Sequence, residues 1–193
     1  MTSSLAAPVA APALNDAQRL YLDLLKKCLT RTVLGAEDWQ LFEPRRGTLP
    51  RIFLAPVAAF LRRQGLRLVR PVPFDQAARE VGRDWPALAE TMVGLRRLEN
   101  LENLIVDLVR RGVPGDLVET GVWRGGAAIF MRGVLKALED GERTVWACDS
   151  FAGLPRSDPE RYLADANDPH WTFAELAVPL AAVKAHFARS GLL

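Results

Sequence analysis

The sequence predicts an α/β fold with parallel strands, and three observations support this prediction. A short apolar run that reads as a strand ends at Val118 and is followed by a turn rich in glycine. Apolar residues at spacings of three and four then indicate a helix that runs to about Leu138. Residues 143–148 form a second β-rich apolar run, which Asp149 ends. Together these segments form a βαβ unit, the first unit of a Rossmann-like nucleotide site.

The turn contains Gly121, Gly125 and Gly126. Because glycine has no Cβ, the backbone at these positions can approach a ligand closely. The spacing does not match the G-x-G-x-x-G pattern that cradles a pyrophosphate, so a smaller nucleoside ligand such as S-adenosylmethionine (SAM) fits better. An ordinary strand-to-helix turn explains the spacing equally well.

An acidic residue stands at the end of each predicted strand. Glu119 follows the first strand and Asp149 follows the second. Open α/β sheets bind their ligands at the carboxyl ends of the strands, where Asp149 can accept hydrogen bonds from two ribose hydroxyls. A helix cap or turn residue is the alternative role for Asp149, but its place in the βαβ unit favours a ligand.

Two motifs resemble the macrocin O-methyltransferase family: Glu119-Thr-Gly-Val-Trp-Arg-Gly-Gly and Asp149-Ser-Phe-Ala-Gly-Leu-Pro. The resemblance covers nearly everything after about Leu20, including Asp84-Trp-Pro and Thr91-Met-Val-Gly-Leu. It implies a SAM-dependent, Mg²⁺-assisted methyltransferase that acts on a sugar hydroxyl of a macrolide-like or other secondary metabolite. It also implies a homo-oligomer that assembles through N-terminal helices.

The resemblance implies that cofactor-binding residues come from three segments of the chain. They are Thr91, Met92, Glu119, Thr120, Gly121, Val122, Trp123, Asp149, Ser150, Phe151 and Gly153. Thr91 and Met92 are equally well explained as core residues. In the resembled family the magnesium ligands and the proposed base follow later strands, so they are expected beyond Leu193. No catalytic residue and no metal ligand is therefore assigned in this sequence.

A complete methyltransferase sheet has more strands than the two predicted here. We therefore expect a Rossmann-like SAM-dependent methyltransferase fold with N-terminal helices, truncated after the second strand. Two parallel strands leave an edge unpaired, so the chain alone is expected to be inactive and to bind SAM weakly. The alternative function is a non-catalytic SAM-binding remnant or an oligomerisation module.

Three regions are predicted: a disordered leader at residues 1–14, a helical capping or dimerisation region at 15–110, and the SAM-binding domain from 111 to 193. The formal net charge of +2 indicates no particular partner. Only Cys28 and Cys148 occur, which excludes a disulfide framework. Both are predicted to be buried in a protein of a reducing compartment, the cytoplasm. No signal peptide, membrane span or nucleic-acid-binding stripe is recognisable.

The N-terminal region reads as a series of helices. Asn15 or Asp16 can cap a helix to about Thr32, with an apolar face of Leu20, Leu24, Leu25 and Cys28. Residues 35–47 read as irregular. Residues 52–69 interleave apolar positions with arginines, which indicates either a helix packed on the domain with a solvated basic face or, less favoured, a surface for anions or membranes.

Asp84 is expected to cap a helix that begins at Trp85, with Leu88, Met92, Leu95 and Leu98 on one stripe. A second helical stretch is expected to end at a turn over residues 110–115. Residues 155–169 read as a loop, which the resemblance makes a lid. Residues 179–190 read as a helix with Leu180, Val183 and Phe187 buried, and His186 is expected on its surface.

Overall fold

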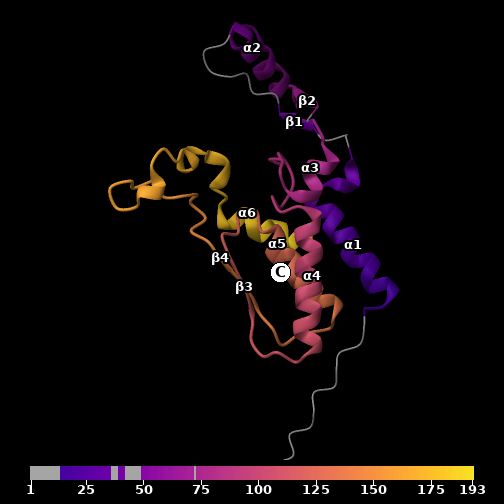
Figure 1. Cartoon of the computed structure of the whole chain (residues 1–193). Helices are drawn as coiled ribbons and strands as arrows, with labels where there is room; N and C mark the ends of the chain where they lie inside the picture. The colour runs from indigo at the N-terminus through magenta and orange to yellow at the C-terminus, as the bar shows by residue number, and fades with distance from the viewer. Residues whose placement is uncertain (1–13, 36–38, 42–48, 72) are drawn as a thin grey trace, which may run out of the picture.

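A computed structural model describes residues 14–35, 39–41, 49–71 and 73–193 of the chain. A helical body packs against a two-stranded parallel sheet, and a small antiparallel ribbon extends away from this body (Figure 1). Residues 1–13 of the predicted leader lie outside the described residues. The last residue of that leader, Leu14, is buried in the core of the body, which corrects the predicted boundary by one residue.

The core lies between three helices: α1 (Asp16–Thr30), α4 (Leu95–Arg110) and α5 (Gly126–Ala137). Helix α5 is central, because Ala128, Ile129, Phe130 and Leu135 are completely buried on several of its sides. It contacts α1 and α4 as well as both strands of the parallel sheet. The predicted apolar stripe of α5 is therefore confirmed.

The parallel sheet consists of β3 (Leu117–Thr120) and β4 (Val145–Cys148). Leu117 lies opposite Val145, and Thr120 lies opposite Cys148, so both strands end at the same edge. Helix α5 connects them as the crossover, which confirms the predicted βαβ unit. This register places the residues after Thr120 beside those after Cys148, where the candidate site lies.

One face of the parallel sheet packs on the core and the other is exposed. Leu117, Val145 and Ala147 contact the core, whereas Val118 is 62% exposed and Trp146 is 56% exposed. Cys148 lies on the same exposed face. Cys28 is also exposed, so the prediction that both thiols are buried is wrong.

Helix α1 begins with a capping box. Asn15 Oδ1 accepts a hydrogen bond from Gln18 N, and Gln18 Oε1 accepts one from Asn15 N, which satisfies two amides at the helix start. Of the predicted apolar face, Leu20 is 70% exposed and Leu24 is 51% exposed, so these two side chains point away from the core. Leu22 and Leu29 face the core instead, and Leu25 is partly buried against it.

No helix begins at Trp85, because residues 83–94 have no regular secondary structure. Asp84 does not cap a helix and instead pairs with Arg79 in α3 (Gln76–Val81). A single helix, α4, then runs from Leu95 and contains the whole second predicted stretch. The tertiary ion pair therefore overrides the local helical signal at Asp84.

The ribbon pairs β1 (Trp39–Leu41) with β2 (Val69–Pro71) in antiparallel register. Helix α2 (Leu49–Arg63) connects these strands and lies beyond them, away from the body (Figure 1). The helix is thus shorter than the predicted segment of residues 52–69, and it lies beyond the ribbon and away from the body, so the favoured prediction that it packs on the domain is wrong. The pairing of β1 with β2 was not predicted, since only short segments take part.

Short 3-10 helices complete the chain: η1 (Thr32–Leu34), η2 (Leu163–Asp165), η3 (His170–Thr172) and η4 (Ala174–Leu176). The predicted last helix is α6 (Leu180–Arg189), whose Val183 is buried. Leu180 is 45% exposed, so its predicted burial is wrong. None of the helices in the described ranges has the length and hydrophobicity to cross a bilayer.

The core-facing side of α1 leads to a prediction about stability. Leu22→Ala should lower the free energy of unfolding by about 2–5 kcal/mol, since it removes a fully buried side chain from the core. Leu20→Ala, two residues away and exposed, should change it by less than about 0.5 kcal/mol. Chemical denaturation of both variants measures the difference, and equal losses would show that both leucines face the core.

Candidate functional site

The candidate site lies where β3 and β4 end, at the carboxyl edge of the parallel sheet. Gly121 N donates to Cys148 O over 3.0 Å and ties the two strand ends together. Gly121 has φ +88°, and a Cβ there would meet no atom within 4 Å. The space beside Gly121 is therefore open, as the predicted approach of a ligand to this backbone requires.

The other two glycines of the turn serve packing. A Cβ on Gly126 would lie 2.5 Å from Glu90 O and 2.6 Å from Thr91 Cβ. A Cβ on Gly125 would lie 2.9 Å from Val183 in α6. The prediction that a ligand can approach the backbone thus holds for Gly121 and is wrong for Gly125 and Gly126. At these two positions the absence of a Cβ lets other segments of the chain pack closely.

The carboxylate of Asp149 holds the glycine turn. Its Oδ2 accepts hydrogen bonds from Val122 N at 2.6 Å and Trp123 N at 3.2 Å, and its Oδ1 accepts one from Phe151 N at 2.7 Å. Partial burial would raise the pKa of Asp149, but these amides and that of Ser150 lower it below its ordinary value. Asp149 is therefore ionised at neutral pH and bridges the turns after both strands.

Asp149 also fixes two strained residues. Trp123 has φ +50° and Phe151 has φ +55°, a region that residues other than glycine rarely adopt. Each of these residues donates its backbone N–H to the Asp149 carboxylate. Such strain persists only where surrounding contacts compensate for it, and here the carboxylate does so.

Glu119 carries an acceptor that no described residue satisfies. The pKa of Glu119 is raised from 4.5 to about 7, chiefly by burial and also by the charge of Asp149, although the N–H of Ala128 lowers it. Its Oε2 atom is buried and has no hydrogen-bond partner among the described residues. Because orphaned acceptors of this kind are costly, the geometry suits a cationic donor from a ligand.

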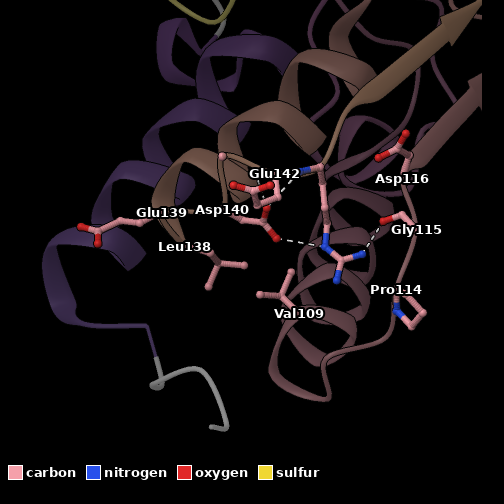
Figure 2. Close-up of a pocket in the computed structure, with 10 residues that line it drawn as sticks. Val109, Pro114, Gly115, Asp116, Leu138, Glu139, Asp140 and Glu142 are labelled. Carbon is pink, nitrogen blue, oxygen red and sulfur yellow. Dashed lines mark hydrogen bonds and ion pairs between the residues drawn. The ribbon is translucent and has the colours of Figure 1, made fainter. Parts of the chain in front are cut away.

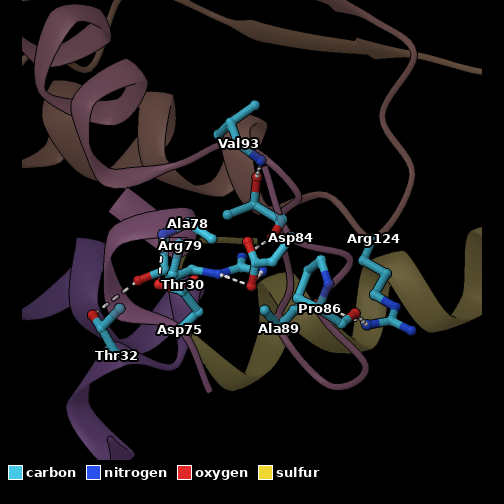
Figure 3. A network of polar contacts seen from close by, with 11 residues as sticks. Thr30, Thr32, Asp75, Ala78, Arg79, Asp84, Pro86, Ala89, Val93 and Arg124 are labelled. Carbon is cyan, nitrogen blue, oxygen red and sulfur yellow. Dashed lines mark hydrogen bonds and ion pairs between the residues drawn. The ribbon is translucent and has the colours of Figure 1, made fainter. Parts of the chain in front are cut away.

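Thr91 reaches the site from the irregular segment before α4. It is 4% exposed and lies against Gly126, while Glu90 O accepts a hydrogen bond from Gly126 N at 2.9 Å. Thr91 Oγ1 also lies 3.2 Å from Val93 N (Figure 3). The structure thus brings Thr91 to the start of α5 on a loop, whereas the sequence had predicted a helix; Met92 is half-buried in the same loop, and its carbonyl lies near Gly82.

The remaining predicted residues form the turns around these groups. Val122 is buried and supplies a backbone N–H, whereas the side chain of Thr120 is exposed. Ser150 Oγ donates to Gly153 O over 3.1 Å and closes the turn after β4. Gly153 has φ +83° and packs against Ala177. These residues shape the rim of the site through their backbone.

Arg124 was not predicted as a site residue. Its Nη1 donates to Ala89 O at 2.8 Å and to Pro86 O at 3.4 Å, and its guanidinium lies 4.2 Å from the ring centre of Trp123. Burial lowers the pKa of Arg124, and the charge of Glu90 counteracts this. The sequence did not indicate a role for Arg124 at the site, because its hydrogen-bond partners are backbone oxygens of residues distant in sequence.

Two contacts bring C-terminal segments to the glycine turn. Trp123 Nε1 donates to Glu175 O over 2.8 Å, which anchors the long excursion between β4 and α6. His186 Nδ1 lies 2.8 Å from Arg124 O and donates to it. His186 is therefore half-buried and structural, and its predicted surface position is wrong.

A separate hollow of about 720 Å³ lies at the opposite, amino end of the sheet. Arg143 pairs with Asp140 and donates to Gly115 O, and Figure 2 shows dashed lines that reach these two partners. Asp116 accepts from Thr144 N and Trp146 Nε1. This end holds none of the predicted cofactor residues, and its contacts fasten β3 to β4.

The described residues contain no cluster of three or more side chains suited to a metal ion. The prediction placed the magnesium ligands beyond Leu193, so this finding does not test it.

The comparisons with known proteins agree with the sequence motifs. The model of a family described as macrocin O-methyltransferase (TylF) matches residues 18–193. An 8-demethyl-8-(2,3-dimethoxy-α-L-rhamnosyl)-tetracenomycin-C 4′-O-methyltransferase of Streptomyces olivaceus is 43% identical over 180 residues, 93% of this chain and 59% of that protein. A demethyldecarbamoylnovobiocin O-methyltransferase of Streptomyces niveus is 46% identical over 181 residues, 93% of this chain and 60% of that protein.

Two further relatives are similar over parts of their length. A mycinamicin III 3″-O-methyltransferase of Micromonospora griseorubida is 46% identical over 129 residues, 65% of this chain and 51% of that protein. The structure of the O-methyltransferase NovP matches with a TM-score of 0.70 and 37% identity, over 91% of this chain and 60% of NovP. This chain thus spans 51–60% of the length of these relatives.

The raised pKa of Glu119 predicts a pH dependence of stability. Between pH 4.5 and about 7 the native protein binds more protons at Glu119 than the unfolded chain, so its free energy of unfolding falls as pH rises. Glu119→Gln keeps the side chain neutral and should remove on the order of 2–3 kcal/mol of this fall. Urea denaturation at several pH values measures it. Glu142→Gln is the exposed control, and an unchanged slope in Glu119→Gln would contradict the assignment.

Proposed function

Since this chain belongs to the macrocin O-methyltransferase family, we propose that it binds SAM and serves the transfer of a methyl group to a sugar hydroxyl of a secondary metabolite. The observation that carries the proposal is the pair of carboxylates at the adjacent ends of β3 and β4. Glu119 has an unsatisfied buried oxygen and Asp149 is ionised. The open backbone of Gly121 lies in the turn that follows β3.

In this proposal the carboxyl end of each strand recognises a different part of SAM. Glu119 Oε2 accepts a hydrogen bond from the ammonium group of the methionine part. Asp149 keeps lone pairs beyond its three backbone hydrogen bonds and accepts from the ribose hydroxyls. Thr91 and Met92 border the methionine end, and the backbone of residues 120–123, together with Ser150, Phe151 and Gly153, forms the rim.

When bound, SAM supplies an electrophilic methyl group on a sulfonium. The residues of this chain contribute orientation, since two carboxylates and a rigid turn hold the donor in one pose. The buried side chains of Val122 and Trp123 exclude water from the base of the turn. No described residue is assigned as the base that removes the hydroxyl proton.

The acceptor is proposed to be a glycosylated natural product of an antibiotic pathway. The names of three relatives refer to a rhamnosyl tetracenomycin, a mycinamicin and a novobiocin precursor. These products differ in their aglycones, so the relatives support the class of acceptor and do not single out one compound.

Magnesium is part of the proposal because a divalent cation lowers the pKa of a coordinated hydroxyl and orients it. The described residues hold no cluster of three ligating side chains, so no ligand is assigned among them. A cytoplasmic location is also proposed, on the ground that both described cysteines are free thiols.

A second role, assembly of identical chains, is supported by the outward face of α1. Leu20 and Leu24 are exposed on that face, and exposed apolar side chains on one helix face mark interaction surfaces. Phe60 of α2, which is 62% exposed, belongs to a separate candidate contact surface. An oligomerisation module without catalysis would self-associate with no affinity for SAM, and sedimentation with and without SAM distinguishes it from the enzyme.

Calorimetry with SAM tests the cofactor site. A version extended to the full length of the relatives should bind SAM, and Asp149→Ala in that version should bind about tenfold more weakly or worse, since a charge-assisted hydrogen bond contributes about 1.5–3 kcal/mol. The control is Glu142→Gln. Because Asp149 also holds the turn, both variants are compared at a temperature where circular dichroism shows them folded; equal affinities for SAM would refute the assignment.

The reaction is tested by incubating a version extended to the full length of the relatives with labelled SAM, Mg²⁺ and a panel of desmethyl glycosides. Label should appear on a sugar oxygen of at least one glycoside. Transfer of label to protein or nucleic acid and to no glycoside would contradict the proposed acceptor class.

A further inference from the structure

The segment that carries Thr91 and Met92 is a closed loop. Its ends, Gly82 and Gly94, are in backbone contact: a Cβ on Gly94 would lie 2.3 Å from Gly82 N, and one on Gly82 would lie 2.7 Å from Gly94 N. The residues between them have no regular secondary structure. Compact loops of this length with adjoining ends are Ω-loops, which pack by their own side chains.

A single buried guanidinium bridges the two limbs of this loop. Arg79 is 1% exposed, and its Nε and Nη2 both donate to Asp84 Oδ2, the former over 2.8 Å. Its Nη1 donates over 3.3 Å to Thr91 O, near the other end of the loop (Figure 3). The fixed fork of an arginine therefore sets the distance between Asp84 and Thr91.

The outer side of the loop is fastened to the candidate site. Gly126 N donates to Glu90 O, and Arg124 donates to Ala89 O. Glu90 N donates to Leu29 O at the end of α1. A shift of the loop would therefore move Thr91 relative to the first turn of α5 and to the glycine turn.

We propose that Arg79 is a positioning residue for the cofactor site, because its buried guanidinium fixes the loop that presents Thr91 and Met92 to the start of α5. The identity of the cofactor in this inference rests on the proposed function. The bridge that Arg79 makes from Asp84 to Thr91, here called the clamp, rests on the structure alone. The hydrogen bonds of the Arg79 guanidinium go to Asp84 and Thr91 and not to the glycine turn, so its effect passes through the loop.

Lysine cannot reproduce this clamp. It carries one ammonium on a flexible chain, so it can pair with Asp84 but cannot hold Thr91 O in a fixed geometry at the same time. Arg79→Lys therefore keeps the positive charge and removes the bridge. Asp84→Asn removes the charge from the more exposed partner, whose side chain is 29% exposed, and serves as the second variant if Arg79→Lys does not fold.

Two measurements test the proposal on the full chain. The first is the affinity for SAM by calorimetry, which Arg79→Lys should weaken by about tenfold or more, since small displacements of positioning groups have large effects. The second is amide hydrogen exchange at Gly126 and Glu90, which should become at least about tenfold faster in Arg79→Lys. Asp84→Asn should act in the same direction.

Leu22→Ala is the matched control, because it destabilises the core from α1 without touching the loop. It should change the affinity for SAM by less than about twofold. Equal weakening by Leu22→Ala and Arg79→Lys would overturn the proposal in favour of a merely structural arginine, as would unchanged exchange at Gly126. Failure of wild-type protein to bind SAM would refute the proposed function, whereas the exchange experiment would still decide whether the clamp exists.

Discussion

The site depends on one carboxylate that accepts three backbone hydrogen bonds. Asp149 receives the amides of Val122 and Trp123 from the turn after β3, and the amide of Phe151 from the turn after β4. This arrangement needs both strands to end in register, as they do. It also compensates for the positive φ angles of Trp123 and Phe151. Without the carboxylate, three amides would lose their partners and the two turns would lose their connection.

Other parts of the chain are placed relative to this turn. Trp123 holds the C-terminal excursion through Glu175 O, and the next residue, Arg124, holds the loop before α4 through Ala89 O. His186 of α6 contacts the carbonyl of Arg124. Three segments distant in sequence therefore converge on two consecutive residues, which explains why this turn is both buried and strained. Of the three glycines in the turn, Gly121 alone has open space around it, and it follows two residues after Glu119, whose buried Oε2 is unsatisfied.

Local patterns predicted the parts of the fold that local forces determine. The succession of β3, glycine turn, α5 and β4 was predicted because the apolar spacing and the glycines that indicate it lie in one continuous stretch of sequence. The helix expected at Trp85 is wrong because Asp84 pairs with Arg79, and the close contact of Gly82 with Gly94 closes a loop there. The core-facing side of α1 could not be identified from the sequence, since Leu20 and Leu22 are equally apolar and only the position of α5 selects Leu22. Asp149 was predicted at the site, but its bonds to the turn were not, because backbone amides leave no trace in a sequence.

Amide hydrogen exchange of wild-type protein and Asp149→Ala, measured residue by residue, tests this account most directly. If the carboxylate organises the site, the amides of Val122, Trp123 and Phe151 will lose at least about tenfold in protection in the variant. The amides of Val134 and Leu135 inside α5 will keep theirs, because the core does not depend on Asp149. Unchanged protection at all three turn amides would contradict the account, since the turn would then hold its shape without the carboxylate.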